Sequence, residues 1–135
     1  MASTPNFAST DLLAAAAIAA TANTNHDGSG TLATLFTGTN GLGQRLDAIG
    51  VNAGAVNGVT TAGKIRFFIS TDGGTTKRKL GELSVSAATP SATVAAFSDA
   101  WYPPRPLAVP DANTIIYAAT NNAELFAAQV YGSKF

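Results

Sequence analysis

The feature that most constrains the fold of this chain is a series of short strand-like runs separated by turn residues. The clearest run is Lys64–Ser70 (KIRFFIS), in which Ile65, Phe67 and Ile69 occupy alternate positions. Because successive side chains of a strand point to opposite faces of a sheet, this alternation predicts a strand with these three side chains in the core. The residues that follow, Thr71–Thr76 (TDGGTT), predict a hairpin connection, since aspartate and glycine suit tight turns.

Similar runs recur along the chain at intervals of about 10 to 15 residues, a spacing typical of a β-sandwich or jelly roll. The prolines of Trp101–Pro110 restrict that stretch to a sheet edge or a loop. In Arg45–Ala53 the alternation slips by one residue, which indicates a β-bulge or burial on both faces. We predict further strands at Thr31–Thr37, Arg45–Ala53, Lys79–Ser86, Thr93–Phe97, Thr114–Thr120 and Glu124–Tyr131.

The predicted fold class is therefore all-β, with a single antiparallel, jelly-roll-like β-sandwich of about eight strands. Residues 11–135 are numerous enough to form this sandwich as one domain. Residues 1–10 (MASTPNFAST) form an N-terminal arm that docks on another chain, with Pro5 and Phe7 as its anchors and interface residues. Residues 11–22 are ambiguous, because alanine and leucine favour a helix while the same run also suits a strand.

The chain carries little charge, with eight acidic and eight basic side chains and a net charge of zero. The charged fraction of 12% is about half the usual ~25%, which predicts that copies of the chain or a partner cover part of the surface. Zero net charge gives no support for a nucleic-acid or membrane partner. No Lys or Arg precedes Arg45, and the apolar run Leu12–Ala22 is short, so we expect neither a signal peptide nor a membrane span.

Few residues could support chemistry. Asn23–Gly30 (NTNHDGSG) places oxygen-bearing side chains at alternate positions, as a calcium loop does, but Asp27 is its one carboxylate. Thr34 stands where the bidentate glutamate of such a loop would be, so we interpret the segment as a plain turn. His26, the single histidine, is expected to be a solvated loop residue. We predict no catalytic residue, no metal site, no cofactor and no enzyme activity.

The segment Trp101–Pro106 (WYPPRP) is the strongest candidate for a binding surface. Trp, Tyr and Arg are enriched at the energetically important centres of protein interfaces, which makes Trp101, Tyr102 and Arg105 candidate contact residues. Aromatic side chains also stack on sugar rings, so a glycan site is an alternative. A third interpretation is structural, in which the tryptophan clamps its own loop over the open end of the sandwich.

Several segments together resemble a family of small proteins encoded among the structural genes of tailed bacteriophages. They are the start NFAST, the turn ANTNHDGSGTL, the strand TAGKIRFFIS with its hairpin, and the ending IIYAATNNAELFAAQVYGSKF. These proteins are similar to capsid decoration, or cement, proteins. The resemblance implies a compact β domain, made in the host cytoplasm, that sits as a homotrimer on the capsid exterior and ties major capsid subunits together. A carbohydrate- or receptor-binding module, or a tail or head-fibre adaptor, is the alternative.

Overall fold

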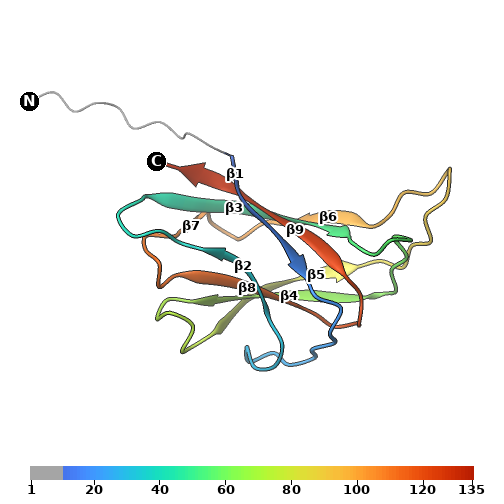
Figure 1. Cartoon of the computed structure of the whole chain (residues 1–135), viewed down its shortest axis with the longest axis horizontal. Helices are drawn as coiled ribbons and strands as arrows, with labels where there is room; N and C mark the ends of the chain where they lie inside the picture. Colours follow the sequence, from blue (N-terminus) through green and yellow to red (C-terminus); the bar gives the residue numbers. More distant parts are fainter. Residues whose placement is uncertain (1–10) are drawn as a thin grey trace, which may run out of the picture.

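The computed structural model describes residues 11–135. These residues form nine β-strands in two antiparallel sheets that pack face to face as a sandwich (Figure 1). The predicted all-β sandwich is confirmed, and the predicted arm with Pro5 and Phe7 lies outside the described residues. The strands are β1 (Leu12–Ile18), β2 (Ala33–Thr37), β3 (Gln44–Ala53), β4 (Gly63–Ser70), β5 (Arg78–Val85), β6 (Ser98–Trp101), β7 (Leu107–Ala108), β8 (Ile115–Thr120) and β9 (Phe126–Lys134).

The strand order is that of a jelly roll. The first sheet has the order β1-β9-β3-β6, with the two-residue strand β7 also paired to β3, and the second sheet has the order β2-β8-β4-β5. Strands from the beginning and the end of the chain are therefore neighbours in both sheets, as in other jelly rolls. The register between β3 and β9 shifts between Leu46 and Ala48, so of the two alternatives for the slipped alternation, a bulge or burial on both faces, the structure shows the bulge.

The hydrophobic core lies between the inner faces of the two sheets. Ile65 and Phe67 of β4 are fully buried there, as predicted, and Ile69 is partly buried against the same cluster. Phe97 meets Phe126 of β9 edge-on, with ring centroids 6.2 Å apart. Such a pair stabilises the fold beyond the burial of its area, because the positive edge of one ring faces the negative face of the other.

The ambiguous Ala-rich run forms a strand. β1 pairs antiparallel with β9 along the run. Its side chains alternate, with Ala14, Ala16 and Ile18 packed against or within the core while Ala15 and Ala17 are exposed. The favourable helix propensity of alanine is overridden because β9 offers a backbone partner and the core accepts one face of the strand.

The predicted hairpin at Thr71–Thr76 joins β4 to β5. The Asp72 carboxylate accepts hydrogen bonds from the backbone N–H of Thr76 and from the hydroxyl of Ser70, and these bonds lower the pKa of Asp72 to about 2. Gly73 has a φ of 75°, which lies in the left-handed region that glycine tolerates. The Asp-Gly-Gly sequence thus supplies both the hydrogen-bond acceptor and the backbone freedom of this turn.

The predicted strand at Thr93–Phe97 is wrong, because β6 begins at Ser98. Ser91 turns the chain before that point, since its side-chain oxygen accepts the backbone N–H groups of the residues two and three positions later. Local bonds of this kind compete with a strand ladder. Pairing with β3 then begins where Ser98 faces Asn52.

Candidate binding surface

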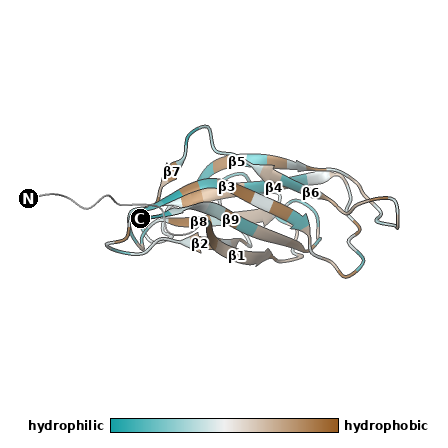
Figure 2. Cartoon of the chain, turned by 90° about the horizontal axis from the view of Figure 1, so that it is seen from above, coloured by the Kyte–Doolittle hydropathy of each residue, from teal (hydrophilic) through white to brown (hydrophobic). Residues whose placement is uncertain are grey.

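The outer face of the first sheet forms a broad surface without charged side chains. Residues that face each other across neighbouring strands lie on the same side of a sheet, so the register identifies this surface. Tyr131 of β9, for example, lies between Leu12 of β1 and Ala48 of β3. Figure 2 views the molecule from the side of this sheet. We call the surface the neutral face, and it consists of Leu12, Ala15, Ala17, Ala48, Gly50, Asn52, Ser98, Ala100, Ala127, Gln129 and Tyr131.

The neutral face carries one aromatic ring and a row of hydrogen-bonded polar side chains. The Asn52 Nδ2 donates to Gln129 Oε1 over 2.8 Å, and the Ser98 hydroxyl donates to Asn52 Oδ1 over 2.6 Å. The Tyr131 ring lies beside Gly50, where an added Cβ would come within 3.1 Å of ring atom Cε2. Tyr131 is 43% exposed. The neutral face therefore presents an aromatic ring beside amide side chains that are already ordered.

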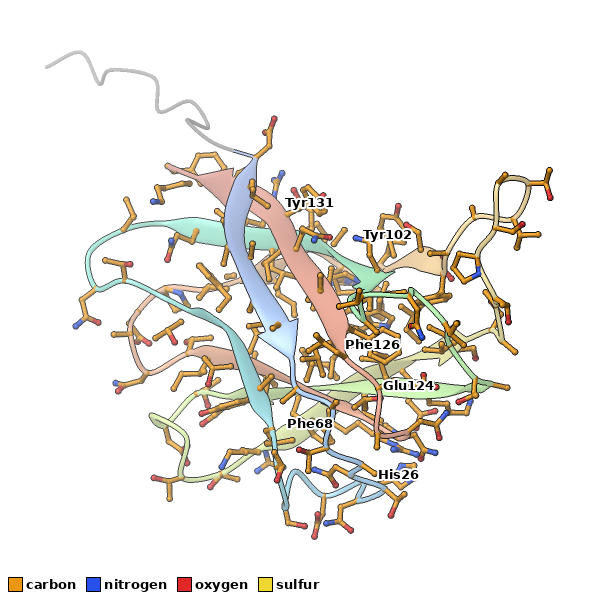
Figure 3. All side chains as sticks on the ribbon, turned by 45° about the vertical axis from the view of Figure 1, so that its right-hand side comes forward. His26, Phe68, Tyr102, Glu124, Phe126 and Tyr131 are labelled. Carbon is orange, nitrogen blue, oxygen red and sulfur yellow. The ribbon has the colours of Figure 1, made fainter. Side chains whose placement is uncertain are left out.

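Charged and aromatic residues border the neutral face. Arg45 and Asp47, near the start of β3, form an ion pair with Arg45 Nε 2.9 Å from Asp47 Oδ1. The Arg45 guanidinium also lies 5.9 Å from the ring centroid of Phe135. Beyond β6, Tyr102 is 70% exposed, and Figure 3 shows it on the same side of the molecule as Tyr131.

The outer face of the second sheet carries a cluster of charges. Glu82 Oε1 of β5 lies 2.6 Å from Lys79 Nζ and 3.2 Å from Arg66 Nε, and Glu82 Oε2 lies 3.6 Å from Lys64 Nζ. The hydrogen bond from Lys79, together with the charges of Lys79, Lys64 and Arg66, lowers the pKa of Glu82. His26 Nδ1 is 3.5 Å from Glu82 Oε1, and its side chain is more than half exposed.

The loop between β1 and β2 packs onto this charged face. Arg66 is 5% exposed and donates from Nη1 to the backbone oxygen of Asn23 over 3.3 Å. Phe68 lies on the same side of β4 as Arg66, is fully buried, and appears in Figure 3 on the side of the second sheet that carries His26. An added Cβ at Gly28 would come within 2.7 Å of the Cβ of Lys77, so the loop also contacts the residues before β5. The second sheet is thus partly covered by the chain itself.

The structure separates the three residues predicted as contacts. The Trp101 ring stacks on Phe67, with centroids 5.0 Å apart and planes at 29°, and it lies over Gly81. Trp101 lies in β6 and packs against the core cluster, and its role as a contact residue stays a prediction. Tyr102 and Arg105 are exposed, and their role as contact residues stays a prediction.

The segment compared above with a calcium loop is held by its own side chains. Asn23 Nδ2 donates to the backbone oxygens of Ser29 and Thr31, and Asn23 Oδ1 accepts the backbone N–H of Asn25. Asp27 Oδ1 accepts the hydroxyl and the backbone N–H of Ser29, and these two bonds lower the pKa of Asp27. Within residues 11–135, no three His, Cys, Asp or Glu side chains are grouped so that they could hold a metal ion.

The neutral face cannot be predicted from the sequence alone, because its residues come from four strands that are distant in the sequence. One signal was available in β9, where Ala127, Gln129 and Tyr131 alternate with the buried residues Ala128 and Val130. The partners of these residues across β1 and β3 depend on a register that the sequence does not reveal.

Residues 11–135 were searched for pockets and for membrane-spanning helices. No pocket is found among these residues. These residues form no helix that is long and apolar enough to cross a membrane.

No protein-family model matches the chain, and no curated protein matches it. Among solved structures, the chain is similar to the N-terminal CBM22-1–GH10 modules of an endo-1,4-β-D-xylanase from Clostridium thermocellum, determined in complex with xylohexaose. The likeness has a sequence identity of 13% and a TM-score of 0.37, and it covers 89% of this chain and 24% of that one. The chain thus spans about a quarter of the protein it matches. A likeness this distant carries no argument about function.

Proposed function

We propose that this protein is a non-enzymatic structural protein of a bacteriophage particle, a capsid decoration protein that attaches to the assembled shell through its neutral face. The observation that carries the proposal is the absence of charge from the neutral face, where Leu12 and Tyr131 are exposed among small side chains. The centres of protein interfaces are depleted in charged residues and enriched in aromatic ones. The neutral face has this composition, whereas the outer face of the second sheet holds the charges around Glu82.

Small side chains let a sheet face approach another protein surface closely. Burial of apolar area contributes roughly 25 cal/mol per Å², and an uncharged face avoids the cost of removing water from unpaired charges. A domain that binds the assembled lattice and not the free subunit stabilises the lattice by mass action. The partner in this proposal is the major capsid protein, on the capsid exterior, after synthesis of the decoration protein in the host cytoplasm.

A binding experiment with capsids of the encoding phage tests the proposal. Ala127 lies between Ala17 and Asn52 on the neutral face, so Ala127→Lys places a charge in its centre. We expect this variant to bind capsids at least tenfold more weakly, a loss of about 1.4 kcal/mol or more. Thr34→Lys, at an exposed position of β2 in the second sheet, is the matched control and should bind as the natural protein does. Equal binding by both variants would overturn the assignment of the face.

Carbohydrate binding is a second candidate function, favoured by the chemistry of one part of the neutral face. Sugar rings stack on aromatic side chains, and sugar hydroxyls bond to amides. The Tyr131 ring and the hydrogen-bonded pair Asn52–Gln129 provide these groups close together. Calorimetry with a panel of soluble oligosaccharides distinguishes the candidates. Saturable sugar binding that Tyr131→Ala abolishes, without capsid binding, would replace the first proposal by the second.

A further inference from the structure

The sequence contains two asparagines that are directly followed by glycine, Asn40-Gly41 and Asn57-Gly58. In such a pair the backbone nitrogen of glycine can attack the side-chain carbonyl carbon of asparagine, because glycine has no side chain to obstruct the approach. The first pair lies in the loop before β3 and the second in the loop after it, so they are at opposite ends of this strand (Figure 1). Both asparagines are exposed, and the structure presents the same chemistry to solvent in two different surroundings.

The glycine nitrogens of the two pairs differ in their hydrogen bonds. The Gly58 N–H donates to the backbone oxygen of Ala55 over 3.0 Å. The Gly41 N–H donates to no group of residues 11–135, since its turn is closed by the Leu42 N–H, which donates to the Thr39 oxygen over 3.3 Å. The attacking nitrogen must lose its proton, and a hydrogen bond from that N–H stabilises the protonated form. The Gly41 nitrogen is therefore the more reactive of the two.

The space around the two glycines also differs. A Cβ added at Gly41 would meet no atom within 4 Å. A Cβ added at Gly58 would lie 3.1 Å from Cγ of Pro90 and 3.4 Å from Cβ of Ala96. Ring closure moves the glycine backbone toward the asparagine side chain, and packed neighbours resist such a movement. The loop before β3 leaves its glycine free to make this movement.

The two asparagine side chains, in contrast, are held in similar ways. Asn40 Oδ1 accepts the backbone N–H of Ala112 over 2.9 Å. Asn57 Oδ1 accepts the backbone N–H of Val59 over 3.2 Å. Each side chain therefore has one such bond to break, and the difference between the two pairs lies in the glycines.

We propose that Asn40 is a site of spontaneous deamidation and that the fold selects it over Asn57. The Gly41 nitrogen loses its proton and bonds to Cγ of Asn40, while the bond from Cγ to Nδ2 breaks and ammonia leaves with the proton. Water then adds to one of the two carbonyl carbons of the resulting succinimide and opens the ring to aspartate or isoaspartate. The reaction consumes one water and involves no oxidant or reductant. A chain with a net charge of zero thereby gains one negative charge.

Modification changes a contact between two loops. Asn40 holds the N–H of Ala112, which lies in the loop before β8. Isoaspartate adds one carbon to the main chain, so its side chain cannot keep this bond in the same geometry. We expect the Ala112 amide to exchange its hydrogen faster in the isoaspartate form. Asn40 is not part of the neutral face, so capsid attachment and deamidation can fail separately.

The test is peptide mapping by mass spectrometry of the full-length protein after incubation in mildly alkaline buffer. Water enriched in the heavy oxygen isotope marks every chain that has passed through the succinimide. We expect Asn40 to be converted about tenfold faster than Asn57, because the net contribution of one hydrogen bond corresponds to a factor of up to about ten. Equal rates, faster conversion of Asn57, or no conversion of either asparagine in the folded protein would overturn the proposal.

The same chain unfolded in guanidinium chloride is the control for the effect of sequence. Unfolding removes the hydrogen bond and the packing of Gly58, so both asparagines should then react at similar rates. A preference for Asn40 that is equally large in the unfolded chain would show that the fold does not select the site.

Two matched variants identify the modified residue in the intact protein. Asn40→Gln should remove most of the acidic species that isoelectric focusing detects after incubation, because glutamine reacts far more slowly through its larger ring. Asn57→Gln should leave that species unchanged. An acidic species that persists in Asn40→Gln and disappears in Asn57→Gln would contradict the assignment.

Discussion

At the scale of single residues, Trp101 and Phe67 form the contact that links the edge of the first sheet to the core. The indole stacks on the Phe67 ring and covers Gly81, where any side chain would collide with it. Alternation in the sequence predicted Phe67 in the core correctly. Alternation does not show which face of the sheet the Trp101 side chain occupies. That face depends on the register of β6 with β3, in which Trp101 pairs with Ile49.

Phe67→Ala should lower the free energy of unfolding by about 3–5 kcal/mol, since it removes a fully buried ring and the partner of Trp101. Denaturant unfolding measures this loss. Tyr102→Ala, at an exposed position, is the control and should change stability by less than about 0.5 kcal/mol. Similar midpoints for Phe67→Ala and the natural protein would show that the core is placed incorrectly.

Glu82 predicts a dependence of stability on pH. Its pKa is lowered from 4.5 in the folded protein, so its contribution is fully present above pH 4.5 and is lost as the pH falls below that value. Glu82→Gln should therefore lower the melting temperature near pH 7, because Arg66 loses its carboxylate partner, and the difference should shrink in acid. Asp47→Asn, which breaks the more exposed pair with Arg45, should have a small effect. A Glu82→Gln effect that is equally large in acid would contradict this account.

At the scale of elements, the sequence predicts strands best where alternation is strong and turn residues follow. β4, its hairpin and β5 were predicted for this reason, although burial of Phe68 on the other face was not. Phe68 shares its side of β4 with Arg66, which contacts the backbone oxygen of Asn23 some forty residues earlier, and the alternation of β4 does not reveal that this loop packs there. β1 was ambiguous because alanine runs lack contrast between their faces, and only pairing with β9 decides between helix and strand.

The loop between β1 and β2 should depend on Asn23. This residue is buried and satisfies two backbone oxygens and one backbone N–H of the loop. Asn23→Ala leaves these groups without their partner and should cost about 1–3 kcal/mol of stability. Asn25→Ala, at an exposed position of the same loop, is the control. Thermal unfolding of the two variants checks the difference, and equal melting temperatures would show that the loop is held by other contacts.

At the scale of the whole molecule, the jelly roll presents two outer faces of different character. One carries the charges around Glu82 and part of the chain's own loop, and the other is the neutral face. Low total charge predicts that copies of the chain or a partner cover part of the surface, and Trp101–Pro106 remains the sequence-based candidate for that surface. The neutral face was not predicted, because its residues become neighbours only when β1, β9, β3 and β6 pair in register.

Hydroxyl-radical footprinting of the protein, free and bound to the assembled capsid, tests most directly whether the neutral face is the attachment surface. Tyr131 and Leu12 are exposed on that face in the isolated chain, whereas Val59 and Val94 are exposed in loops and are not part of the neutral face. Attachment through the neutral face predicts that Tyr131 and Leu12 become protected on capsids while Val59 and Val94 react as before. Unchanged reactivity of Tyr131 and Leu12, with protection of other residues, would contradict the account.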